Sequence, residues 1–144
     1  LRIMSLDDPL KKMSKSIPTG CLYLADSPKT IREKVKRAVT DSLTTIEYDL
    51  EKRPAISNLV LIYSEFSGLS ISEVVKKFQN AGYGKFKDDL AELIIKTLEP
   101  FQQRRDKLIK NKRLVMKILA EGKKKSTFVA EVTMKEVTKK VGLI

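Results

Sequence analysis

The chain has 144 residues, 42% of them hydrophobic, and its 29 lysines and arginines against 18 aspartates and glutamates leave a net charge of +11. It contains no histidine and one cysteine, Cys21, which excludes Ser-His and Cys-His catalytic pairs, an intrachain disulfide and a thiolate metal cluster. Any chemistry must therefore use lysine, arginine, carboxylates, hydroxyls or backbone amides, and we expect no protein-bound metal.

The positive charge favours a polyanionic partner, such as nucleic acid, nucleotide phosphates or an anionic membrane. A generally lysine-rich proteome is the alternative explanation. No apolar run reaches the length of a membrane span, and Leu1-Arg2-Ile3-Met4 has none of the features of a secretory signal. The first residue is not methionine, which is compatible with a chain that begins inside a longer protein. We expect an intracellular protein.

The first residues predict the end of a strand followed by a basic loop. Residues 1–4 are apolar and extended enough for a strand end, and Asp7-Asp8-Pro9 then breaks the chain. Residues 9–27 combine prolines and a glycine with three lysines, which indicates a long, mobile loop.

Helical periodicity dominates the remainder. Ser27 as N-cap and Pro28 at the first helical position predict a helix that ends near Asp41-Ser42. A connection over residues 43–53, with a short extended piece at residues 45–48, leads to a second helix over residues 54–67 that Gly68 terminates.

Three further helical segments follow, beginning with a third helix that the Ser70-x-x-Glu73 capping box opens. A fourth helix is expected over about residues 85–111, with a kink at Pro100. Its apolar positions, including Phe101 and Leu108, are expected to face the core. Two last helices, over residues 112–121 and about 126–141, are expected on either side of Gly122 and a lysine run. The fold expected is mainly α, a helical bundle preceded by a strand end and a basic loop.

The densest chemical signal is the segment Lys12-Met13-Ser14-Lys15-Ser16. Two lysines three residues apart, with serine hydroxyls close to them in the sequence, suit a polyphosphate, because ammonium groups stabilise oxygens that gain charge when an α-phosphoryl group is attacked. A mobile loop can also close on ATP and open for product. A solvated basic loop is the alternative.

The same string resembles the KMSKS signature of class I aminoacyl-tRNA synthetases, and it follows an expected strand end as in that fold. The resemblance to tryptophanyl-tRNA synthetases extends over most of the chain. It rests on the segments Arg2-Ile3-Met4, Asp8-Pro9-Leu10-Lys11, Ala38-Val39-Thr40-Asp41-Ser42, Ile56-Ser57-Asn58-Leu59, Ile62-Tyr63-Ser64, Ser67-Gly68, the run from Gly82 to Glu92, and Leu98-Glu99-Pro100. The last thirty or so residues are similar only in helical character.

This resemblance implies that residues 1–27 end a Rossmann-type catalytic domain and residues 28–144 form a helical anticodon-binding domain. The family activates tryptophan with ATP and Mg²⁺ as co-substrate and transfers it to tRNA(Trp), without a prosthetic group. It implies a homodimeric parent protein, no membrane partner and a cytoplasmic or organellar location. Lys12 and Lys15 would stabilise the phosphates, with Lys15 acting mainly in the transition state. The ATP-binding residues implied are Ile3, through its backbone, and Lys12, Met13, Ser14, Lys15 and Ser16.

For the anticodon, Asp41 is the first candidate for a contact with a base edge, because a carboxylate can accept from a cytosine amino group. The alternative is that it merely ends a helix. Lys87 is the second candidate, with a solvated lysine as the alternative. Arg37 and Lys85 are weaker candidates for phosphate contacts.

Two departures from the family pattern bear on activity. Ile17-Pro18-Thr19 stands where the family usually has Asp-Pro-Asn, which removes one anchor for the closed loop. The family's histidine-containing phosphate-binding turn and the tryptophan pocket are absent from this sequence. We therefore expect a C-terminal fragment that alone neither activates tryptophan nor charges tRNA. A free-standing basic helical module for RNA or another polyanion, and a helical scaffold that is merely basic, are the alternatives.

Overall fold

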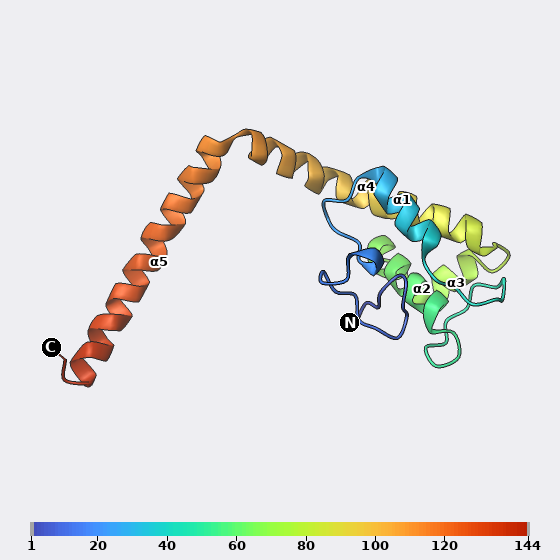
Figure 1. Ribbon diagram of the computed structural model, residues 1–144, viewed down its shortest axis with the longest axis horizontal. Coiled ribbons are helices and arrows are strands. Elements are labelled where there is room, and N and C mark those ends of the chain that lie inside the picture. The colour runs from blue at the N-terminus through green and yellow to red at the C-terminus, as the bar shows by residue number, and fades with distance from the viewer. Residues whose placement is uncertain (1, 144) are drawn as a thin grey trace. The chain divides into compact units, whose positions relative to one another are not determined.

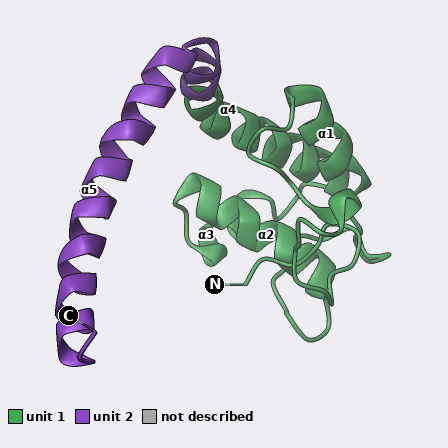
Figure 2. Ribbon diagram, turned by 60° about the vertical axis from the view of Figure 1, so that its left-hand side comes forward, with its two compact units in different colours: residues 1–102 green, residues 103–144 purple. Residues whose placement is uncertain are grey.

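The computed structural model describes residues 2–143 and is helical throughout its regular parts (Figure 1). A short 3-10 turn, η1, spans Pro18–Gly20, and five α-helices follow in the described chain: α1 (Pro28–Arg37), α2 (Pro54–Ser67), α3 (Ile71–Lys77), α4 (Tyr83–Lys110) and α5 (Lys112–Lys140). The expected mainly α class is confirmed. Two compact units can be distinguished, residues 1–102 and residues 103–144, and each is described by itself (Figure 2).

The predicted strand end is not found among the described residues. Met4 instead forms a single antiparallel bridge with Lys12. On either side of this pair, Ser5 N donates to Lys11 O at 2.8 Å and Met13 N donates to Ile3 O at 3.0 Å. The segment before the loop is therefore extended, but it pairs only with the loop's own first residues. Leu1, where the expected strand end begins, lies outside the described residues.

Helix α1 begins as predicted and ends earlier than predicted. The Ser27 hydroxyl caps it by accepting from Thr30 N at 3.1 Å, and Pro28 occupies the first turn. The helix ends at Arg37, because Ala38 already has φ −51° and ψ 136° and Val39 N donates to Leu6 O at 2.7 Å. A backbone hydrogen bond to the N-terminal segment thus replaces another helical turn, and residues 38–42 are not helical.

Helices α2 and α3 match the sequence signals that predict them. Gly68 ends α2 in the left-handed conformation, with φ 74°, which costs a glycine little. Both halves of the Ser70–Glu73 capping box are present at the start of α3. The connection over residues 43–53 is irregular, as expected, and the short extended piece predicted at residues 45–48 does not form a strand.

The core of the first unit lies between these helices and the first part of α4. Tyr63 from α2, Phe78 after α3 and Phe86 from α4 are buried, and their rings meet with centroids 4.9–5.8 Å apart, two of the three pairs edge to face. The fully buried aliphatic side chains around them are those of Ile31, Val35, Ile46, Ile56, Leu59, Val60, Val74, Leu90 and Ile94. Leu6 belongs to the same cluster, so the segment before the basic loop is part of the core.

The last two helices correct two expectations. In α4, the side chains of Phe101 and Leu108 are 45% and 41% exposed, so they are not core residues. In place of two short helices, one helix, α5, runs through Gly122. A glycine inside a helix costs only about 1 kcal/mol relative to alanine, and the lysines, glutamate and alanine around it favour helix. No residue of α5 is buried, and no described helix is both long and apolar enough to cross a membrane.

Candidate functional site

The base of the lysine loop is tied to the core from both of its ends. The side-chain amide of Asn58, buried in α2, accepts from Met4 N and donates to Met4 O, both at 2.9 Å. At the other end, Leu6 N donates to Gly20 O at 2.9 Å. The Asp7 carboxylate accepts from the hydroxyls of Ser5 and Thr19, both at 2.5 Å. Those two hydrogen bonds lower the pKa of Asp7. The loop thus projects from a fixed base.

Of the three lysines in the loop, Lys11 is paired, whereas no described residue neutralises the two of the signature. The Lys11 ammonium lies 2.8 Å from Asp8 Oδ2, and this bond lowers the pKa of Asp8 and raises that of Lys11. Lys12 and Lys15 are exposed, and within residues 2–143 their ammonium groups form neither an ion pair nor a hydrogen bond. Both are therefore available to an anionic ligand.

The backbone of the signature is nevertheless ordered. Ile17 N donates to Ser14 O at 3.0 Å, Ser16 N donates to Ser14 Oγ at 3.3 Å, and the Tyr23 hydroxyl donates to Lys15 O at 3.0 Å. Met13 is half-buried and packs against the core, so it anchors the middle of the segment. Ser16 and Ile17 are exposed.

Ile3 lies next to the loop, as a shared ligand site would require. Its carbonyl accepts from Met13 N at 3.0 Å. A backbone contact of Ile3 with a ligand would therefore use its N–H or the second lone pair of that carbonyl. The side chains of Ile3 and Met13 line one apolar hollow together with Leu22, Tyr23, Leu24, Ile62, Glu65, Phe66, Ile94 and Leu98.

Asp41 lies in the connection after α1, four residues beyond the last helical residue, so the interpretation that it ends a helix is wrong. Its carboxylate is held by Arg53, whose Nε lies 2.9 Å from Oδ2 and whose Nη2 lies 3.1 Å from Oδ1. Leu43 N and the Tyr83 hydroxyl also donate to Oδ1. The Arg53 side chain is 6% exposed and that of Asp41 25%. Asp41 is thus fixed by a nearly buried cation and remains accessible from one side.

The electrostatics of this cluster follow from its hydrogen bonds. The guanidinium of Arg53 lowers the pKa of Asp41 to about 2, and the Tyr83 hydroxyl contributes in the same direction. Burial, followed by the adjacent Asp41 carboxylate, raises the pKa of Tyr83 to about 12. The carboxylate therefore stays charged and the phenol stays a donor at neutral pH.

The other anticodon candidates differ in the hydrogen bonds and ion pairs that their side chains already form. The Lys87 ammonium is half-buried and donates to Ala38 O at 2.7 Å, and burial lowers its pKa, so it is not a simple solvated lysine. Lys85 pairs with Asp89 at 2.5 Å on the surface of α4. Arg37 is exposed, and its side chain has no hydrogen bond or ion pair to any other described residue.

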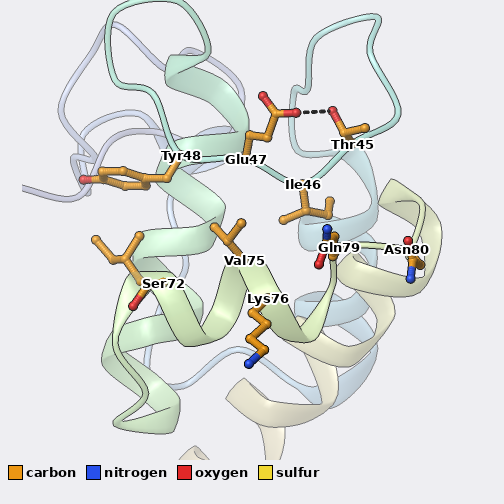
Figure 3. Close-up of a pocket in the computed structure, with 10 residues that line it drawn as sticks. Thr45, Ile46, Glu47, Tyr48, Ser72, Val75, Lys76, Gln79 and Asn80 are labelled. Atoms are coloured by element: carbon orange, nitrogen blue, oxygen red, sulfur yellow. Dashed lines mark hydrogen bonds between the residues drawn. The ribbon is translucent and has the colours of Figure 1, made fainter.

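A hollow with a mixed polar and apolar lining lies beside the connection that carries Asp41 (Figure 3). It has a volume of about 770 Å³ and lies between residues 45–48 and α3, with Gln79 and Asn80 at one end. Thr45 lines it and also accepts from Arg53 Nη1 at 3.1 Å. The hollow and the Asp41 cluster therefore depend on the same stretch of backbone.

Comparison with known proteins decides the family. The family model described as tRNA synthetases class I (W and Y) matches residues 1–99, which cover the lysine loop, the Asp41 cluster and most of the helical core. The chain belongs to this family. Among individual relatives, this class I synthetase chain is 47% identical to the tryptophan–tRNA ligase of Listeria monocytogenes and 44% identical to that of Bacillus subtilis. Each alignment covers 99% of this chain and 43% of the relative, so the chain spans less than half of their length.

A solved structure supports the same assignment. The tryptophanyl-tRNA synthetase of Mycoplasma pneumoniae superposes with a TM-score of 0.66 and 29% sequence identity, over 74% of this chain and 35% of the other. The fold of the synthetase chain is therefore shared with a solved member of the family.

The residues that organise the lysine loop and the surroundings of Asp41 in this synthetase are not among the predicted site residues. Arg53 falls within the predicted connection over residues 43–53, and Asn58 and Tyr83 fall within segments that carry the resemblance, so none of them is singled out for a role of its own. A signal for Arg53 did exist, since one arginine lies within twelve residues of Asp41, Glu47, Asp49 and Glu51. No sequence pattern indicates that Asn58 reaches across fifty-four positions to Met4.

Proposed function

We propose that this chain is the C-terminal part of a tryptophan–tRNA ligase. In this proposal it supplies the lysine loop for ATP-dependent activation of tryptophan and the helical surface that reads the anticodon of tRNA(Trp). The observation that supports it most directly is the pair of unneutralised ammonium groups, Lys12 and Lys15, on a loop with an anchored base, in a chain 47% identical to a tryptophan–tRNA ligase. A free-standing polyanion-binding module is not favoured, since the relatives named above are ligases.

The chemistry assigned to the loop is stabilisation of developing charge. In activation, a carboxylate oxygen of tryptophan attacks the α-phosphorus of ATP, and the bond to the bridging oxygen breaks as pyrophosphate leaves. Lys12 and Lys15 would neutralise the phosphate oxygens, and Lys15 would act mainly on the transition state. Mg²⁺ enters as part of the nucleotide substrate. Ser14 and Ser16 would add neutral donors, Ile3 would offer a backbone contact to the adenosine part, and Met13 would belong to the ATP-binding segment.

The two parts of the chain would have different roles. Residues 1–27 would complete a Rossmann-type catalytic domain supplied by the rest of the ligase, and residues 28–144 would form the tRNA-binding part. Ile17, in place of the family's aspartate, would leave the closed loop with one anchor fewer. Alone, the chain would lack the tryptophan pocket, so we expect no tryptophan-dependent pyrophosphate exchange from it.

Anticodon reading would centre on Asp41. Its charged carboxylate can accept from the amino group of a cytosine, and the tryptophan codon UGG pairs with an anticodon that contains cytosines. Lys87 still has donor capacity beyond its bond to Ala38 O, since an ammonium has three N–H groups. Arg37, whose side chain has no partner among the described residues, would contact a phosphate more readily than Lys85, which is paired.

Binding to the anticodon stem-loop of tRNA(Trp) tests this proposal. The chain would be titrated into the labelled stem-loop and into an unrelated stem-loop across a salt series, with fluorescence anisotropy as the readout. We expect the tryptophan stem-loop to be preferred and the preference to be lost in Asp41→Ala. Asp88→Ala, which removes an exposed carboxylate from α4, is the charge-matched control.

Equal binding of both stem-loops, with steep salt dependence, would mean that charge alone acts and would overturn the anticodon role. Pyrophosphate exchange by the isolated chain would contradict the prediction that it is catalytically incomplete.

A further inference from the structure

Arg53, Tyr83 and Asp41 form a closed ring of hydrogen bonds. Arg53 Nη2 donates to the Tyr83 hydroxyl at 2.6 Å, that hydroxyl donates to Asp41 Oδ1, and Arg53 donates to both Asp41 oxygens. The three residues come from the end of the connection, the start of α4 and the segment after α1. The ring therefore joins three separate parts of the first unit at one carboxylate.

The two oxygens of Asp41 are occupied unequally. Oδ1 accepts from Leu43 N at 3.0 Å, from Arg53 Nη2 and from the Tyr83 hydroxyl. Among the described residues, Oδ2 accepts from Arg53 Nε alone. A carboxylate oxygen has about two lone-pair sites, so Oδ1 is saturated and Oδ2 has one site open. Since a quarter of the Asp41 side chain is exposed, that open site is the acceptor left to an external donor.

Arg53 itself is not placed to bind RNA. Its side chain is 6% exposed, and every nitrogen of the guanidinium already has an acceptor. Nη1 donates to Thr45 Oγ1 at 3.1 Å and lies 3.1 Å from Glu47 Oε2, while Nη2 also donates to Thr45 O at 2.8 Å. Glu47 is 59% exposed and contributes little, so Asp41 is the main counter-charge of the buried cation.

We propose that Arg53 and Tyr83 are positioning residues, which fix Asp41 so that Oδ2 alone accepts the amino group of an anticodon cytosine. This inference rests on the proposed anticodon role of Asp41.

The physical reason is that a fixed acceptor discriminates better than a mobile one. Uracil carries a carbonyl oxygen where cytosine carries its amino group, so with uracil two acceptors would face each other. A freely rotating carboxylate could turn away and admit a bridging water, which would weaken this penalty. A carboxylate held at both oxygens cannot turn, so replacing cytosine by uracil keeps its full cost in binding free energy.

The experiment compares the tryptophan anticodon stem-loop with versions in which each cytosine of the anticodon is replaced by uracil. Dissociation constants would be measured by fluorescence anisotropy for the full 144-residue chain and for Asp41→Ala, Tyr83→Phe and Arg53→Lys. Tyr63→Phe is the matched control, because it also removes one hydroxyl that is hydrogen-bonded in the first unit, here to Lys77 Nζ at 2.6 Å. Circular dichroism melting would check that each variant is folded.

We expect the unmodified chain to prefer cytosine at one position by about tenfold. In Tyr83→Phe that preference should fall about threefold while the salt dependence is unchanged, since one fixing hydrogen bond is lost and no charge is removed. Arg53→Lys should lower the preference at least as much, and Tyr63→Phe should keep it. An NMR titration should also show the carboxyl pKa of Asp41 rising in Tyr83→Phe.

The outcomes distinguish the anticodon role of Asp41 from the positioning role of Arg53 and Tyr83. If the unmodified chain does not distinguish cytosine from uracil, or if Asp41→Ala still does, the anticodon role of Asp41 fails. If Asp41→Ala loses the preference but folded Tyr83→Phe keeps it in full, Asp41 reads the base and the positioning role is wrong. Should Arg53→Lys not fold, Tyr83→Phe alone decides. Equal losses in Tyr83→Phe and Tyr63→Phe would reduce the effect to general stability and overturn the inference.

Discussion

Replacing Asn58 by alanine should detach the start of the lysine loop from helix α2. Asn58 is 3% exposed, and its amide satisfies both backbone groups of Met4 on the side away from the Lys12 bridge. The side-chain amide thus makes the two hydrogen bonds that a neighbouring strand would make with Met4. Because the next residues of the chain enter the core through Leu6, losing this contact should affect the stability of the whole first unit.

The magnitude follows from the two hydrogen bonds. Each contributes about 1 kcal/mol net, and the half-buried Met4 N–H and C=O groups would be left with partial access to water, at a further cost of about 1 kcal/mol. We therefore expect Asn58→Ala to lower the free energy of unfolding by about 2–4 kcal/mol. That is a large fraction of the roughly 5–15 kcal/mol typical of a domain.

Asn58→Asp tests the hydrogen bond that the amide donates to Met4 O. One carboxylate oxygen can still accept from Met4 N, but the other would face Met4 O, so the variant should be less stable than Asn58→Ala at neutral pH. A protonated carboxyl can donate to Met4 O, so the pKa of the introduced group should be raised on folding. Its stability should therefore recover as the pH falls through that raised value.

Urea denaturation followed by far-ultraviolet circular dichroism measures these differences. Asn80→Ala is the matched control, because Asn80 is exposed and its loss should change stability by less than about 0.5 kcal/mol. An Asn58→Ala variant as stable as this control, or an Asn58→Asp variant that does not recover in acid, would refute the role assigned to the amide.

Three further predictions concern single groups. A β-carbon added at Gly20 would lie 1.8 Å from Ser5 Oγ and 1.9 Å from Asp7 Oδ1, whereas one added at Gly82 would have no atom within 4 Å. Calorimetry should therefore show that Gly20→Ala is less stable by about 1–3 kcal/mol and that Gly82→Ala is nearly unchanged. Asp41 has a pKa of about 2 in the folded protein against an ordinary value of 3.8, so its stabilising effect should be complete above about pH 4 and be lost as the pH falls towards 2. In urea titrations, the free energy of unfolding of Asp41→Asn should therefore fall by about 1–2 kcal/mol less over this pH range than that of the unmodified chain, after allowance for screening. Lys87→Met removes a hydrogen bond to the end of α1 and should cost about 1 kcal/mol in thermal unfolding, while Lys96→Met, at an exposed position of α4, should be neutral.

Local sequence signals suffice where the start or end of a helix depends only on neighbouring residues. The start of α1, the whole of α2 and the start of α3 were correctly predicted, because proline, a capping serine and glutamate, and a left-handed glycine act on their immediate neighbours. The break expected at Gly122 was wrong, since a single weak helix former does not outweigh a helix-favouring surrounding. The end of α1 was misplaced because a distant partner, Leu6 O, decides it.

The sequence by itself determined the helical class and, through a resemblance, the family and the lysine loop. These depend on residue types at short spacing, which act within a turn or a loop. Only the tertiary structure decided that Lys12 and Lys15 are unneutralised, and that Arg53 and Tyr83 hold Asp41. Arg53 and Tyr83 are thirty positions apart, and hydrogen bonds act over about 3 Å, so such partners become visible only after the chain has folded.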